Sequence, residues 1–256
     1  MTNKDTGFSL VEIMVGIVIG VIAIAAAFSS YNYFNKSYDL VSQKAKINKA
    51  AREGLAVIAR DLRNAGYIDI NYDASDKNTK LIGVTKNYLD SKFDKLIIWY
   101  TTSPTERVQI EYTPTKYINN KYQGTNENRM YLSRKVIFGS VTQDATELVS
   151  NISDFQVVFK NREGEKIINV GDTSLEARAN MKKVHTAEIY LTIESSKETS
   201  NIKQKFLVNN DTNSLSFYDK YFRDTFFVSV HTRNLAKHIA ISEQTGTSIG
   251  VSSTYN

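Results

Sequence analysis

One ionisable residue interrupts an apolar stretch near the N-terminus. Between Phe8 and Phe28 the sequence FSLVEIMVGIVIGVIAIAAAF holds a single charged residue, Glu12. A carboxylate in a bilayer costs roughly 2.5–3.5 kcal/mol near the membrane centre, so such a residue usually has a partner and a function. A proteolytic cut between Gly7 and Phe8 would create an α-amine of opposite charge. We expect that amine to neutralise Glu12 of a neighbouring subunit, because the two groups of one chain meet only loosely.

The apolar stretch is long enough to cross a bilayer. A helix rises about 1.5 Å per residue, so roughly 20 residues span about 30 Å of hydrocarbon. A secretory signal ends in a small-residue cleavage site, whereas here the helical pattern continues past Phe28. We therefore expect a leader at residues 1–7 and a transmembrane or filament-core helix at residues 8–28. Gly16 and Gly20 form a G-x-x-x-G pair, which is either a close-packing face or incidental.

The other residues with reactive side chains form no catalytic set. The sequence has no Cys and no nucleophile elbow, P-loop or H-E-x-x-H motif. His185, His231 and His238 do not share metal-ligand spacing, so we expect structural histidines. The prediction is a protein that is not an enzyme and that needs no cofactor.

A short acidic segment imitates the start of a calcium loop. Asp69, Asn71 and Asp73 alternate as oxygen ligands do in such loops, but Ala74 replaces the required Gly and Lys80 replaces the bidentate Glu. We expect a solvated loop and no metal, with other calcium geometries left open.

Aromatic and basic residues alternate between residues 112 and 135. Tyr117, Lys121, Tyr122 and Arg129 are the candidates to stack on bases and pair with phosphates of single-stranded nucleic acid, or to contact an anionic surface. An exposed hairpin with a long loop has the same composition. Surface structure is our interpretation, with a binding surface at these four residues as the alternative.

Helical periodicity continues from the apolar stretch to Gly66. No proline occurs in residues 8–66, and Gly66 stands where a C-cap glycine would end a helix. We expect one long helix whose second half, residues 29–66, is amphipathic and lays an apolar stripe on a globular head. Gly54 lowers helix stability by about 1 kcal/mol and is a candidate bend. The stripe comprises Tyr31, Phe34, Tyr38, Val41, Ala45, Ala51, Leu55, Ile58, Leu62 and Ala65.

Beyond Gly66 the apolar period changes to two, which indicates strands. One helix followed by strands alone predicts an α+β fold, with an antiparallel sheet packed on the helix in a head at residues 67–241. Residues 69–80 and 114–128 are expected as surface loops, and residues 242–256 as a flexible tail. The expected strands are 81–85, 96–101, 108–113, 130–138, 155–159, 187–193, 206–208 and 226–231.

The composition is that of an ordinary globular protein. The chain has 256 residues, 41% hydrophobic and 23% charged, with a net charge of +5. This excludes disordered and collagen-like classes. The absence of Cys excludes disulfides, thiolate zinc sites and iron–sulfur clusters. A charge of +5 over this length is too dilute to indicate a dedicated nucleic-acid-binding domain.

The string G-F-S-L-V-E with its apolar run resembles the leader and N-terminal helix of type IV pilins and of type II secretion pseudopilins. The resemblance implies that a prepilin peptidase cleaves after Gly7 and that Phe8 is then N-methylated. It also implies that Glu12 guides subunit docking.

Downstream strings resemble PilW-type minor pilins. They are AREGLAVIARDLRNAGY (51–67), VSNISDFQVVF (149–159), TAEIYLTIES (186–195) and FRDTFFVSVHTRN (222–234). The resemblance implies pilus assembly or initiation near a filament tip. The implied partners are major and minor pilins, the prepilin peptidase, the inner-membrane assembly platform and, before assembly, membrane lipid. The head would be exported to the periplasm and then reach the cell surface. A J-kind secretion pseudopilin and a tip module that binds DNA or a host surface are the alternatives.

Overall fold

The computed structural model describes residues 9–68, 80–89, 92–103, 105–117, 129–171, 174–200, 202–209 and 214–235. The chain forms two compact units, residues 1–45 and 46–256, and their boundary falls within helix α1 (Leu10–Asn64). The expected leader with Phe8 and the expected tail at 242–256 lie outside the described residues.

Helix α1 has the extent that the sequence predicts, and both of its ends are capped. At its start Ser9 is the N-cap, since its side-chain Oγ accepts a hydrogen bond from the Glu12 backbone N–H at 3.2 Å. At its end Gly66 adopts φ +71° and donates its N–H to the Trp99 carbonyl at 2.8 Å. Glycine adopts a positive φ without steric cost, so the predicted C-cap is confirmed.

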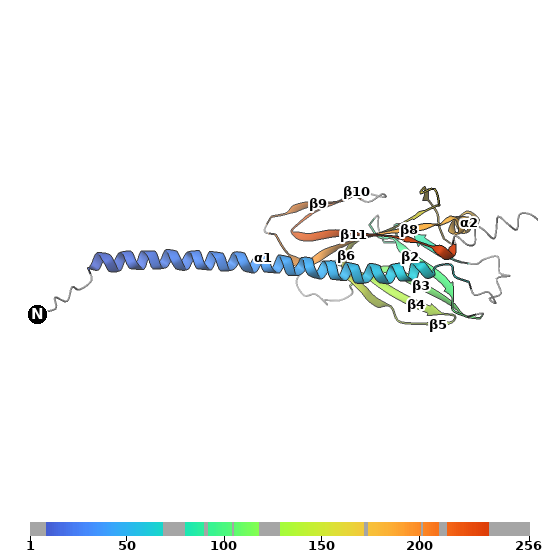
Figure 1. The fold of residues 1–256 in the computed structure, drawn as a ribbon, viewed down its shortest axis with the longest axis horizontal. Helices are drawn as coiled ribbons and strands as arrows, with labels where there is room; N and C mark the ends of the chain where they lie inside the picture. Colours follow the sequence, from blue (N-terminus) through green and yellow to red (C-terminus); the bar gives the residue numbers. More distant parts are fainter. Residues whose placement is uncertain are drawn as a thin grey trace, which may run out of the picture. The chain divides into compact units, whose positions relative to one another are not determined.

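The head is built on one antiparallel sheet, which confirms the α+β architecture (Figure 1). Its main strands pair in the order β1-β2-β3-β4-β6-β8-β11, while β5 pairs with β4, β7 pairs with β6, and β9 and β10 form a separate pair. The bounds are β1 Ile82–Thr85, β2 Lys95–Thr101, β3 Arg107–Lys116, β4 Met130–Phe138, β5 Val141–Thr142, β6 Thr146–Lys160, β7 Lys166–Ile167, β8 Thr186–Glu198, β9 Gln204–Asn209, β10 Ser214–Asp219 and β11 Tyr221–His231.

The head differs from the sequence prediction in several elements. Strands β5, β7 and β10 were not predicted, and β6 begins at Thr146, before the expected strand at 155–159. A second helix, α2 (Leu175–Lys183), interrupts the series of strands, so strands alone do not follow α1. Ser174 caps it by accepting the N–H of Ala177. The loop expected from residue 114 starts later, because Pro114 lies within β3. Pro114 is tolerated there because the pairing of β3 with β2 has ended by Tyr112, so the missing N–H breaks no ladder on that side.

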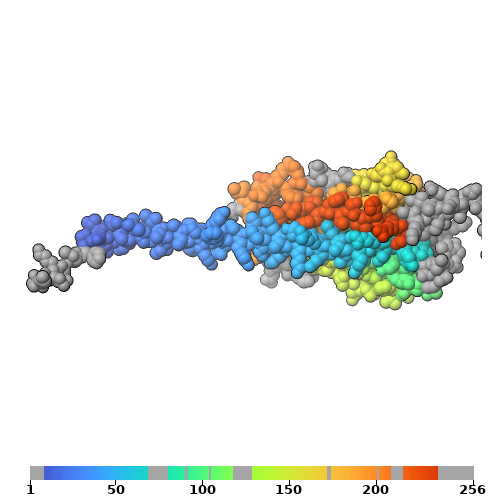
Figure 2. Space-filling model, in the orientation of Figure 1, coloured from blue at the N-terminus to red at the C-terminus, as the bar shows by residue number. Residues whose placement is uncertain are grey.

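Within the head unit, α1 packs on the sheet from Ile47 to Leu62. The side chains of Ala51, Leu55, Ile58 and Leu62 enter the core at helical spacing and are at most 7% exposed. In Figure 2 the cyan surface of this part of α1 lies between the red surface of β11 and the yellow-green surface of β4.

The predicted stripe was wrong in its first half. Tyr31, Phe34, Tyr38 and Val41 are 62–74% exposed. Periodicity shows which face of a helix is apolar but not how far a sheet extends beneath it.

Strand β6 approaches the helix closely at Gly54. A Cβ atom at Gly54 would overlap Cγ2 of Val149, which is 1% exposed. The glycine therefore allows close packing, at a cost of about 1 kcal/mol in helix propensity.

A buried carboxylate ties the last turn of α1 to the sheet. One oxygen of Asp61, Oδ2, accepts the hydroxyl of Tyr112 at 2.5 Å and Nε of Arg134 at 2.8 Å. Burial first, and then the Asp61 charge, raise the pKa of Tyr112. Burial lowers the pKa of Arg134, but its hydrogen bond to Asp61 and the Asp61 charge outweigh burial and raise it. At neutral pH the cluster therefore holds a neutral phenol and a charged Arg134.

Candidate functional site

The apolar half of α1 exposes its side chains on every side. From Leu10 to Phe28 the large hydrophobic residues are 52–74% exposed. An 18-residue window of the helix has a mean hydropathy of 2.7, so by length and composition this helix can cross a membrane. A helix that is apolar all round is stable only when lipid or other helices surround it. This segment is therefore the candidate functional site, as a surface for contact with lipid or other helices.

Glu12 lies at the start of this segment. Its backbone N–H bonds to Ser9, both to Oγ at 3.2 Å and to the carbonyl at 3.1 Å. Within the described part of the chain its carboxylate contacts no cation and accepts no hydrogen bond. The pattern Ser9-x-x-Glu12 is that of a capping box, in which Glu or Gln at the third helical position returns a bond to the cap. This signal was not among the sequence predictions. Only the Ser9 half of the box is formed, because among the described residues the Glu12 carboxylate accepts no hydrogen bond.

Glu12, Gly16 and Gly20 follow one another at intervals of four residues, so they share one face of the helix. A Cβ atom at either glycine would meet nothing within 4 Å. The stripe thus combines one carboxylate with two positions where another backbone can approach closely.

Comparison with known protein families found a match at the N-terminus. Residues 2–28 match the prokaryotic N-terminal methylation motif. The chain carries this motif. The matched residues include the start of the exposed apolar helix.

Comparison with solved structures found a type IV-like pilin from Thermus thermophilus. It is 13% identical in sequence, with a TM-score of 0.46, and the alignment covers 74% of this chain and 96% of the other. A comparison with curated proteins found no match.

Downstream of the methylation motif, two of the four candidate residues for a nucleic-acid surface, Tyr117 and Arg129, lie among the described residues. Arg129 is 5% exposed, so its place on a surface was wrong. The hydroxyl of Tyr117 donates to Glu147 at 2.6 Å, and its ring lies 4.7 Å from that of Tyr131. These rings and charges make internal contacts because β3 pairs with β4 along this stretch. Lys121 and Tyr122 lie outside the described residues.

The two described histidines, His185 and His231, belong to no metal site among the described residues. Pairing of β8 with β11 brings His185 and His231 together, with ring centroids 5.1 Å apart, a contact that their spacing in sequence did not suggest. Within the described ranges, no three His, Asp or Glu side chains are arranged to hold a metal ion. His238 and residues 69–73 lie outside those ranges.

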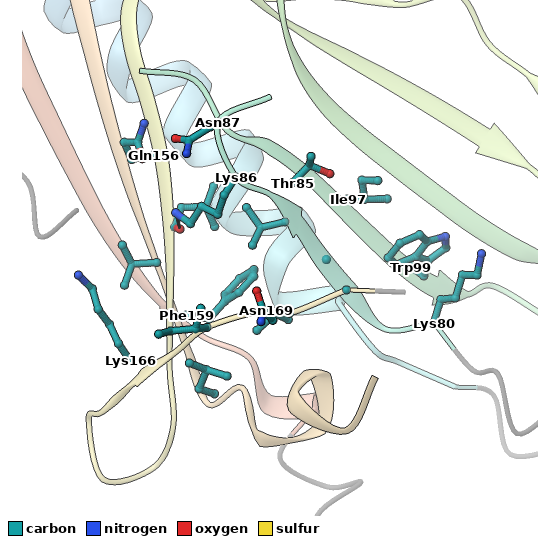
Figure 3. A pocket seen from close by; sticks show the side chains of 18 of the residues that line it. Lys80, Thr85, Lys86, Asn87, Ile97, Trp99, Gln156, Phe159, Lys166 and Asn169 are labelled. Atoms are coloured by element: carbon teal, nitrogen blue, oxygen red, sulfur yellow. Dashed lines mark hydrogen bonds between the residues drawn. The ribbon is translucent and has the colours of Figure 1, made fainter. Parts of the chain in front are cut away.

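A cavity of about 710 Å³ lies beside β1, β6 and β7 (Figure 3). Trp99 forms part of its wall and donates Nε1–H to Gln109 at 2.9 Å. Lys86 donates to Asp94 at 2.6 Å. The described lining residues include Lys80, Lys86, Lys166 and Thr85, and no Asp, Glu, His or Ser.

Proposed function

We propose that this protein is a type IV pilin-family subunit of the PilW-type minor class, which acts by assembling with other pilins. The observation that carries the proposal is an apolar helix, exposed on all sides, that begins inside a methylation motif and holds one carboxylate. Both features concern the same residues and both call for an environment of lipid or neighbouring helices.

In the proposed mechanism α1 moves from lipid into a bundle of helices. Apolar surface is covered before and after this step, so its burial alone gives little driving force. Close packing along Gly16 and Gly20, and pairing of Glu12 with the α-amine of a neighbour's Phe8, favour the bundle. The charge pair also places the helices in a staggered arrangement, because the amine of one subunit lies level with Glu12 of another.

The aromatic residues after the apolar run support this placement. Tyr31, Tyr33, Phe34 and Tyr38 are 62–74% exposed. Tyrosine is enriched at membrane–water interfaces because one end of its side chain is apolar and the other is polar. These residues would mark the outer boundary of the inner membrane, with the head in the periplasm and later at the cell surface. The proposed partners are other pilins, the prepilin peptidase and the inner-membrane platform.

Processing is tested by the intact mass of protein isolated from its native membrane. We expect a chain that starts at N-methylated Phe8. Gly7→Ala should retain residues 1–7, while the control Gly139→Ala, in a distant turn of the head, should mature normally. Wild-type protein that begins at Met1 would overturn the proposal.

The role of Glu12 is tested by two substitutions that separate charge from hydrogen bonding. Glu12→Gln keeps a side chain that a capping box accepts but removes the charge, and Glu12→Val removes both. If charge pairing guides docking, both variants should insert and be processed but fail to enter filaments. Normal incorporation of Glu12→Gln would refute the charge pair. Ser9→Ala is the matched control, because it removes the cap and leaves the charge.

A J-kind secretion pseudopilin would use the same physics with another cargo. Deletion separates the two proposals: loss of surface filaments with normal secretion supports the minor pilin, and the converse supports the pseudopilin.

A further inference from the structure

A second cavity of the head has a volume of about 530 Å³, and most of the charged residues that line it are cations. It lies beside the bulge of β6, where the pairing of β6 with both β4 and β8 shifts register. Four basic side chains line it, against one carboxylate, Glu194. The four are Lys92, Lys116, Arg129 and Arg223.

Each of the three side-chain nitrogens of Arg223 already has a hydrogen-bond partner. It donates to Glu194 at 2.6 Å, to Asp219 at 2.6 Å and to Ser153 at 3.1 Å. Burial raises the pKa of Asp219, but its hydrogen bonds from Arg223 and from the Tyr221 N–H outweigh burial and lower it, so this carboxyl stays charged. The two carboxylates are thus engaged with Arg223.

Arg129 is buried with one edge of its guanidinium unused. Its side chain is 4% exposed, and Nη1 donates to Asn151 Oδ1 at 3.2 Å. Nε and Nη2 have no hydrogen-bond partner in the described part of the chain. The nearest carboxylate oxygen, on Glu194, is 3.9 Å from Nε, beyond hydrogen-bond distance. Ser153 and Arg223 both donate to the other oxygen of Glu194 and hold that carboxylate in place.

The position of Arg129 is built by its surroundings. Asn151 adopts φ +53° at the β6 bulge, and this backbone conformation presents its side-chain oxygen to Nη1. The guanidinium carbon lies 5.2 Å from the centroid of the Tyr221 ring. Buried donors are satisfied in nearly all native structures, so a buried guanidinium with two free donors calls for a ligand.

We propose that this cavity binds an oxyanion, the carboxylate or phosphate group of a small ligand, on the Nε–Nη2 edge of Arg129. These two nitrogens point their hydrogens in parallel, and that fork matches two oxygens of a carboxylate or phosphate. Half-buried Lys92 and exposed Lys116 add positive charge around the same cavity. This activity is separate from the assembly role of α1, and neither depends on the other.

The test is a titration of the full-length protein in detergent with sodium phosphate and then with sodium acetate, at constant pH and ionic strength. Isothermal titration calorimetry and thermal melting followed by Trp99 fluorescence report binding. We expect saturable binding of one anion per chain and a rise in melting temperature that chloride does not produce.

Two variants and one control assign the binding to the cavity. Arg129→Met should weaken binding about tenfold or more, since it removes two charge-assisted hydrogen bonds. Lys116→Gln, at an exposed position, should fold normally and weaken binding by a smaller factor. Arg162→Met makes the same chemical change as the first variant at an exposed turn, and it should bind like wild type.

Each result either supports or overturns the proposed site. Binding of phosphate, of acetate or of both that falls in the Arg129 and Lys116 variants supports the proposal and identifies the oxyanion. Absence of saturable binding to wild type would mean that Glu194 alone balances Arg129, and would overturn it. Equal binding by wild type and both variants would also overturn it. If Arg129→Met does not fold, the Lys116→Gln titration decides.

Discussion

Removal of the Asp61 carboxylate is predicted to destabilise the head more than any single surface change. In Asp61→Ala the hydroxyl of Tyr112 and Nε of Arg134 lose the oxygen that both now contact at 2.5 and 2.8 Å. Each charge-assisted hydrogen bond contributes about 1.5–3 kcal/mol. Breaking a buried pair by removing one partner costs about 3–5 kcal/mol.

The expected loss of unfolding free energy lies toward the lower part of that range. The Arg134 side chain is 21% exposed, so water can solvate part of its charge once Asp61 is gone. We therefore expect a loss of about 3–4 kcal/mol. At about 2–4 °C per kcal/mol for a domain of this size, the melting temperature should fall by about 6–16 °C. Asp61→Asn should lose about half as much, because its carbonyl oxygen can still accept both hydrogen bonds.

The assay is unfolding of the detergent-solubilised full-length protein followed by fluorescence. The chain has one tryptophan, and Trp99 is 6% exposed on β2, so its emission reports the head and not the membrane segment. Asp39→Ala, at an exposed position on the same helix, is the control and should change stability by less than about 0.5 kcal/mol. A fall of less than about 2 °C for Asp61→Ala would refute the reasoning, because the carboxylate would then hold neither partner in place.

Three further predictions concern the packing of the head. Gly54→Ala should lower the free energy of unfolding by about 1–2 kcal/mol, because the cost of overpacking exceeds the gain in helix propensity. In a double-mutant cycle, Val149→Ala should remove most of that effect. Gly66→Ala should cost about 1–2 kcal/mol because its φ of +71° is strained for a residue with a Cβ atom; an unchanged urea midpoint would contradict this. Burial and a nearby carboxylate raise the pKa of Tyr112, so above about pH 10 the unfolded chain releases a proton that the folded chain keeps. Stability should then fall by up to about 1.4 kcal/mol per pH unit from this group. Tyr112→Phe should remove that slope. Parallel profiles of unfolding free energy against pH for the variant and the wild type would contradict the prediction, because folding would then not raise the pKa of the phenol.

The candidate assembly site was predictable from sequence because its signals are local. Glu12 is conspicuous as the one charge in an apolar run, and the spacing to Gly16 and Gly20 sets a shared face without any tertiary information. The cap at Ser9 has an equally local signal, S-x-x-E, although it was not predicted.

Regular elements with strong periodicity were also predictable. The C-cap at Gly66 was confirmed, and β4 has the predicted bounds, Met130–Phe138. Helix α2 was missed because it is short and buries only two described side chains, Ala177 and Met181, which leaves almost no apolar pattern to detect.

By itself the sequence determined the membrane-length helix, the methylation motif, the end of α1 and the change to strands, because each depends on residues within a few positions of one another. Only the tertiary structure decided which charged residues are buried. Asp61 meets Arg134 across 73 positions of sequence, and Arg129 meets Glu194 across β4, β6 and β8. Such contacts depend on strand order and register, because a one-residue shift in register would turn strand side chains such as Arg134 and Glu194 to the other face of the sheet.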